Sequence, residues 1–249
     1  MQQWFLGFDC ATKTFAFSLS RIALPERAQI AQLRARVLAC RELSRRAAAA
    51  AAAGDEMAAA ALSAAASAAA ADLDTAIGGL IMIADGAVCD LAPGRPDAQV
   101  STVERLRAVA AYVAGRIRPA IARAGIADGA LSVVIEYQMG PNARARAVAA
   151  ALVALFATDN VIIVGPSLKN KVSACADGRY ALFAKQYSNS YGANKAHAAF
   201  NFARIEALFG TAIPPTKPLS RRGHIADSFM QVIGHLLFGA DEKDAAKMF

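Results

Sequence analysis

The chain has 249 residues, of which 56% are hydrophobic, and its 27 lysines and arginines outnumber 20 acidic residues to give a formal net charge of +7. This size and apolar content are enough for one large domain, and the basic excess favours a polyanionic partner. The four dispersed cysteines argue against a zinc site or a disulfide framework and indicate a reducing, intracellular compartment.

The first predicted element is a β-hairpin. The aromatic-rich run Trp4–Asp9 turns through Cys10–Thr14 and resumes as the apolar run Phe15–Leu19. Because a strand begins so close to the first residue, we expect no signal peptide and no secretion. Asp9 comes at the end of a buried strand, where a carboxylate requires a cation, a hydrogen-bonding turn or a paired charge. By itself, Asp9 is as compatible with an Asx turn as with a metal ligand.

An arginine- and alanine-rich segment, residues 24–76, follows the hairpin. Its first part has apolar residues at helical spacing and a basic outer face, and Gly54-Asp55 marks the turn of a helical hairpin. Its low-complexity composition predicts an insertion between the second and third strands of a single domain, residues 1–249. The arginines from Arg21 to Arg46 fit either nucleic-acid contact or a solvated helix face. The alanine run is too weakly apolar for a membrane span, and no membrane partner is expected.

Strand character returns at residues 77–84 and 87–91, separated by Asp85-Gly86, which is typical of a turn or a bulge. A helix is then predicted from residue 101 to residue 125. It opens with the capping box Ser-x-x-Glu, and Pro119 is expected to kink it.

A second buried strand also ends on a carboxylate. The run Leu131–Glu136 is continuously apolar up to its last residue, as in a central strand. Asn142 is expected to cap a helix over residues 143–157, and residues 161–164 form a further strand. This alternation predicts an α/β sheet covered on its faces by helices.

The C-terminal third contains basic, aromatic and acidic side chains. Lysines and tyrosines interleave between Ser167 and Ala193, which suits contact with nucleic acid as well as half-buried loop positions. A helix is expected from Asn194 to Phe209. In the last predicted helix His224 and Asp227 are three residues apart and share a face. Such a pair is also common at helix surfaces and caps.

Asp9, Glu136, His224 and Asp227 together form the ligand set expected of a two-metal nuclease. In these residues the sequence resembles the Holliday junction resolvases of the RuvC type, within the ribonuclease H-like superfamily, and especially their poxviral and fungal mitochondrial branch. The motifs that carry the resemblance are Gly7-Phe8-Asp9 with Thr12-Lys13, Val134–Gln138 with Pro141-Asn142 and Arg146, Pro166 with Lys169, Asn194-Lys195, and Arg221–Ser228.

The resemblance implies a ribonuclease H-like mixed five-stranded sheet with helices on both faces, to which the Arg/Ala-rich insertion is added. Asp9, Glu136 and Asp227 would bind two Mg²⁺ ions per active site, with Mn²⁺ as a substitute. His224 would bind the second ion or transfer a proton. The residues expected to contact DNA are Lys13, Gln138, Asn142, Arg146, Lys169, Lys195, Arg221 and Arg222. No small-molecule cofactor is implied.

The implied activity is cleavage of four-way or other branched DNA by a homodimer, because two symmetric cuts require two active sites. The apolar faces of the helices at residues 101–125 and 143–157 are the expected dimer interface. Three features depart from the family pattern: His224 stands where the poxviral pattern has an acid, Tyr137 replaces a glutamine, and the insertion has no counterpart.

Two alternatives stay open. The run Gly7–Thr12 also resembles the first phosphate loop of actin-like sugar kinases and ATPases, although the chain shows neither a second Asp-Gly phosphate loop nor a glycine-rich adenosine motif. The second alternative is a non-catalytic junction-binding protein on the same fold; the retention of all four ligand positions argues against it, whereas the departure at His224 keeps it open.

Overall fold

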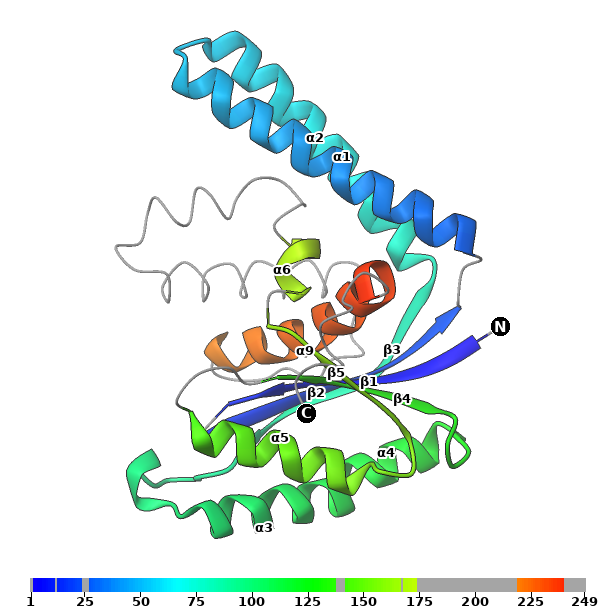
Figure 1. Ribbon diagram of the computed structural model, residues 1–249, viewed down its shortest axis with the longest axis vertical. Coiled ribbons are helices and arrows are strands. Elements are labelled where there is room, and N and C mark those ends of the chain that lie inside the picture. The colour runs from blue at the N-terminus through cyan, green and yellow to red at the C-terminus, as the bar shows by residue number, and fades with distance from the viewer. Residues whose placement is uncertain are drawn as a thin grey trace.

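A five-stranded mixed sheet forms the centre of the computed structural model, in the order β3-β2-β1-β4-β5 (Figure 1). The structure describes residues 2–11, 13–23, 27–137, 142–166, 168–173 and 219–239. The strands are β1 (Gln2–Cys10), β2 (Thr14–Ala23), β3 (Ile81–Asp90), β4 (Leu131–Glu136) and β5 (Asn160–Val164). The first three pair antiparallel, whereas β1, β4 and β5 run parallel. The expected α/β class with a mixed five-stranded sheet is therefore confirmed.

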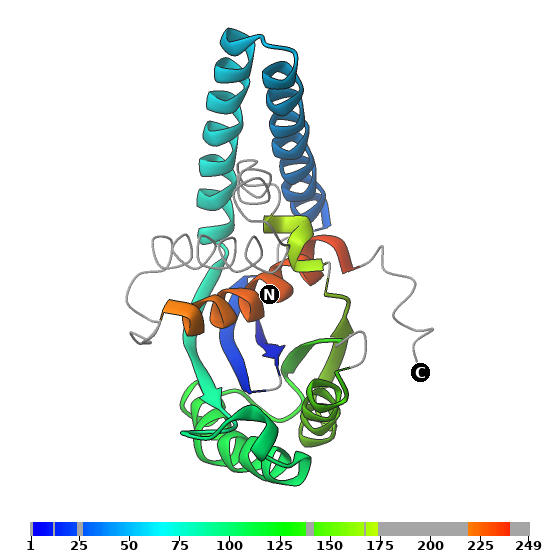
Figure 2. The ribbon, with the colours of Figure 1, turned by 90° about the vertical axis from the view of Figure 1, so that its left-hand side faces the viewer.

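Helices cover both faces of this sheet (Figures 1 and 2). On one face lie α3 (Thr102–Tyr112), α4 (Arg118–Arg123) and α5 (Ala143–Leu155), and on the other lie α6 (Leu168–Ser173) and α9 (Leu219–Phe238). Since successive side chains of a strand point to opposite faces, each strand contributes to two separate cores. Leu6 and Phe8 of β1 pack under α3–α5, whereas Phe5 packs under α9.

A helical hairpin connects β2 to β3 and projects from the layered body (Figure 2). It consists of α1 (Arg27–Ala52) and α2 (Glu56–Gly78). Gly54 makes the turn with a φ of +80°, and the Asp55 side chain caps α2 by accepting a hydrogen bond of 3.0 Å from the Ala58 amide. The turn predicted at Gly54-Asp55 is confirmed. Among the helices in the described ranges, none combines the length and the apolarity needed to cross a bilayer.

The third strand differs from the prediction. β3 is one continuous strand, and Ile77 belongs to the end of α2, because it continues the buried helix face of Leu73. Asp85-Gly86 lies beside a bulge, where the pairing with β2 shifts register between Leu19 and Ser20. Of the two structures that this dipeptide indicated, the bulge is the one that forms.

Pro119 lies in the first turn of α4, just after a change in helix geometry. A π-helical turn, Val113–Ile117, joins α3 to α4 just before the proline, which cannot donate a backbone hydrogen bond. The predicted capping box is present, with Ser101 and Glu104 bonded to each other's backbone amides at 3.2 and 2.8 Å.

The prediction that the apolar faces of the two helices at residues 101–125 and 143–157 form a dimer interface is wrong. Val109, Val113 and Ile117 are fully or almost fully buried beneath the sheet, as are Val148 and Leu152 of α5. These faces cover the strands, whose own apolar side chains would otherwise be exposed to water.

α9 lies directly on β1 at Gly7. A β-carbon added at Gly7 would collide with the Ser228 carbonyl oxygen and lie 2.8 Å from Val232 Cγ2. We expect Gly7→Ala to lower the free energy of unfolding by about 3 kcal/mol, because backbone on both sides prevents relaxation. Urea denaturation measures the change. Gly115→Ala is the control, since an added methyl there meets nothing within 4 Å. Equal stability of the two variants would contradict the close packing of α9 on β1.

Candidate active site

Two buried carboxylates lie side by side at one end of the sheet. Asp9 and Glu136 are near the carboxyl ends of the parallel neighbours β1 and β4, where Phe8 pairs with Ile135. Because Phe8 and Ile135 both point toward α3–α5, the following residues of each strand point toward α9. Each acidic residue is only 6% exposed to solvent. The alternating strand pattern therefore brings the two acids onto the same face.

α9 brings a histidine and a third carboxylate to the same place. Ile225 and Phe229 bury one side of this helix in the core, and His224 and Asp227 project from an adjacent side. His224 Nδ1 lies 2.6 Å from Asp9 Oδ2, although the two residues are 215 positions apart in sequence. All four predicted catalytic residues therefore surround one region between β1, β4 and α9.

Lys169 of α6 lies inside this cluster. Its ammonium donates hydrogen bonds of 3.0 Å to Glu136 Oε2 and 3.1 Å to Asp227 Oδ2. The side chain is 17% exposed. The sequence predicted Lys169 as a phosphate contact. In the structure its ammonium group instead pairs with the carboxylates of Glu136 and Asp227.

Gln231 also belongs to the site, although no prediction from the sequence included it. Its amide nitrogen donates a hydrogen bond to Glu136 Oε2, and the residue is completely buried. Gln231 follows Asp227 by one helical turn, so its position on the same face could have been inferred from the spacing. A buried amide at that point orients the Glu136 carboxylate.

Burial is the largest influence on the pKa values of the three carboxyl groups in the cluster. Burial raises the pKa of Glu136 to about 7 and that of Asp227 to about 6, against the opposing charge of Lys169. Burial also acts to raise the pKa of Asp9, but the hydrogen bond with His224 and the charge of Lys169 lower it overall. The same hydrogen bond raises the pKa of His224.

These shifts predict a pH-dependent stability of the metal-free protein. Between the ordinary pKa of 4.5 and the raised value of about 7, folded Glu136 keeps a proton that the unfolded chain has lost. The free energy of unfolding therefore falls as the pH rises from about 5 to about 7, by roughly 2 to 3 kcal/mol. The raised pKa of His224 acts in the same direction, because its contribution is lost as the pH rises through the folded value.

Urea denaturation in EDTA at pH 5, 6, 7 and 8 tests this prediction. Glu136→Gln is the matched control, since it removes the titrating group and should flatten most of the fall. A stability that stays constant or rises over this range in the parent protein would contradict it.

The donor set suits a divalent cation. Carboxylate oxygens are the preferred ligands of Mg²⁺ and Mn²⁺, and imidazole binds several transition metals. Within the ranges that the structure describes, however, no three or more His, Cys, Asp or Glu side chains are grouped as a metal site. The hydrogen bonds give the reason: Lys169 lies between Glu136 and Asp227, and His224 faces Asp9.

Three predicted DNA contacts lie at the same end of the sheet as the acids. Lys13 is exposed between β1 and β2, and Arg146 is exposed in the first turn of α5. Asn142 caps α5 by accepting a 3.2 Å hydrogen bond from the Ala145 amide. The remaining predicted contacts are not placed: Gln138 and Lys195 lie outside the described residues, as does the helix expected at 194–209, and Arg221 and Arg222 are described only as backbone of α9.

Comparisons with protein-family models, with curated proteins and with solved structures found no match to this chain.

Proposed function

We propose that this chain is a metal-dependent endonuclease of the RuvC type, with a ribonuclease H-like fold, that cuts four-way or other branched DNA. One observation carries the proposal. The four residues that the sequence predicts as metal ligands come from three separate motifs, and they surround a single buried region. The mixed five-stranded sheet with helices on both faces agrees with the fold that the resemblance implies.

Asp9, Glu136 and Asp227 would hold the metal, which when bound neutralises phosphate charge and activates water for in-line attack. His224, whose pKa is raised by its hydrogen bond with Asp9, would in its protonated form donate a proton to the leaving oxygen, or in its neutral form bind a second ion. Lys169 keeps the acids together and adds positive charge toward the scissile phosphate. Lys13 and Arg146 would bind flanking phosphates, which orient the DNA without reading its sequence.

The proposal includes a homodimer in a reducing, intracellular compartment. Symmetric cutting of a four-way junction needs two sites related by a two-fold axis. Cys10 and Cys89 are buried and are not in disulfide bonds, in agreement with a reducing environment.

Cleavage of a fluorescent four-way junction, compared with linear duplex of the same sequence, tests the proposal. We expect cuts of the junction with Mg²⁺ or Mn²⁺ and none with EDTA. Metal-independent binding without cleavage of any branched DNA would instead favour the non-catalytic alternative, and ATP-dependent phosphorylation of a sugar would favour the kinase.

A further inference from the structure

The helical hairpin has its basic and acidic residues on different helices. α1 contains six arginines and one glutamate, whereas α2 contains three acidic residues and no basic one. Interspersed opposite charges would stabilise two such helices by salt bridges within and between them. Because the basic and acidic residues lie on different helices, part of that stabilisation is absent, and α1 is a strongly basic rod.

Three arginines of this rod face solvent. Arg36, Arg45 and Arg46 are exposed, and neither Arg36 nor Arg46 forms a salt bridge within the described part of the chain. Among the residues that the structure describes, Arg45 pairs only with Glu42, on its own helix, and its side chain remains 74% exposed. The three residues span about 15 Å along the helix, at 1.5 Å per residue. A single guanidinium group can donate two parallel hydrogen bonds to the oxygens of one phosphate, whereas the ammonium group of lysine lacks this planar fork of donors.

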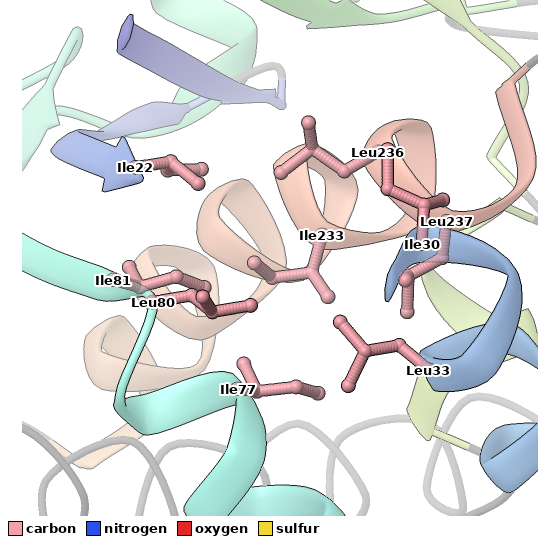
Figure 3. A pocket seen from close by; sticks show the side chains of 9 residues that line it. All are labelled: Ile22, Ile30, Leu33, Ile77, Leu80, Ile81, Ile233, Leu236 and Leu237. Carbon is pink, nitrogen blue, oxygen red and sulfur yellow. The ribbon is translucent and has the colours of Figure 1, made fainter. Parts of the chain in front are cut away.

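Two further arginines fix the hairpin to the helix that carries His224 and Asp227. The guanidinium groups of Arg34 and Arg41 lie 5.5 and 6.0 Å from the centre of the Phe238 ring, at the end of α9. Aliphatic side chains of α1, α2, β3 and α9 meet beside this contact, among them Leu33 and Leu237 (Figure 3). The base of the hairpin is therefore part of the core under α9, and its direction relative to the acid cluster is set by packing.

We propose that the exposed arginines Arg36, Arg45 and Arg46 of α1 bind the phosphate backbone of a duplex arm of the DNA that the active site cuts. This inference rests on the proposed nuclease function and adds a second contact region to it. The occupant is a duplex because its phosphates form a regular linear array of negative charge that an arginine-bearing rod can follow. The outer half of the hairpin is rich in alanine and has no aromatic side chain, so it offers no surface for stacking on bases.

The test is the triple variant Arg36→Gln, Arg45→Gln, Arg46→Gln, since glutamine is a comparable helix former. Fluorescence anisotropy measures the affinity for a long-armed junction over a salt series in EDTA. We expect the slope of log affinity against log salt to become shallower by about 2 to 3, and the affinity to fall at least roughly tenfold at about 0.1 M salt. Circular dichroism checks that the helices are retained.

A matched control separates local contact from total charge. Arg95→Gln, Arg107→Gln, Arg123→Gln removes the same number of exposed arginines from α3, α4 and the loop that precedes α3, on the opposite face of the sheet. The inference would be overturned if the α1 variant kept the affinity and the salt slope of the parent protein. It would also be overturned if the α1 variant and the control variant lost affinity equally. If the parent protein cleaves junctions and the α1 variant binds them with parent affinity, only the proposed contact between α1 and the duplex arm is refuted. If the parent protein neither binds nor cleaves DNA, the proposed nuclease function is refuted. Binding of the parent to anionic vesicles but not to DNA would overturn both.

Discussion

Asp9→Asn is expected to abolish metal-dependent cleavage of four-way junctions while junction binding persists. The substitution keeps the shape of the side chain and removes the charge that faces His224 at 2.6 Å. A ligand to the metal contributes several kcal/mol to transition-state stabilisation, so we expect a loss in rate of at least about a thousandfold. Binding is retained because it depends on cationic side chains that contact phosphates.

Single-turnover cleavage with saturating enzyme measures this rate, and anisotropy in EDTA measures binding. Asp128→Asn is the matched control, because Asp128 is exposed in the loop before β4, away from the cluster. Cleavage by Asp9→Asn at the parent rate would remove Asp9 from the active site and with it the two-metal mechanism.

The second large effect is expected for Lys169→Met. In the metal-free protein this change leaves Glu136 and Asp227 close together without their shared cation. Removing one partner of a buried ion pair costs about 3 kcal/mol or more, and we expect such a loss at pH 8. At pH 5 the loss should be much smaller, because carboxyl groups with pKa values of about 7 and 6 are then protonated.

Urea denaturation at both pH values, with EDTA and with Mn²⁺, measures these differences. A divalent ion should stabilise Lys169→Met more than the parent, because it no longer competes with an ammonium group. Lys13→Met, at an exposed position, should have little effect under any of these conditions. Equal stability of Lys169→Met and the parent at pH 8 in EDTA would show that Lys169 does not compensate the acids.

Much of the site could be predicted because local periodicity encodes which face a side chain occupies. A strand that ends on a carboxylate can be recognised twice, at Asp9 and at Glu136, and the spacing of His224 and Asp227 puts them on one side of a helix. That these motifs meet was implied by their resemblance to the RuvC-type resolvases, and the structure places them together.

Other features depend on which elements meet in space. The sequence around Lys169 indicates a cation after a strand, but only the packing of α6 beside α9 directs its long, flexible side chain to the acids instead of to solvent. The pKa shifts follow from that packing, because desolvation and nearby charges have no counterpart in a linear sequence. The dimer interface predicted on α3 and α5 was wrong for a similar reason. A sequence shows that a helix has an apolar face but not whether that face packs against a sheet of the same chain or against a partner.

The sequence by itself determined the two strands that end near Asp9 and Glu136, the helix face that His224 and Asp227 share, and the arginine-rich composition of the insertion. Only the tertiary structure decided that Lys169 and Gln231 join the acids and that Arg34 and Arg41 tie the insertion to Phe238 of α9. The physical reason is that helix and strand patterns arise from neighbours along the chain. Charge compensation and anchoring instead arise from contacts between segments far apart in sequence.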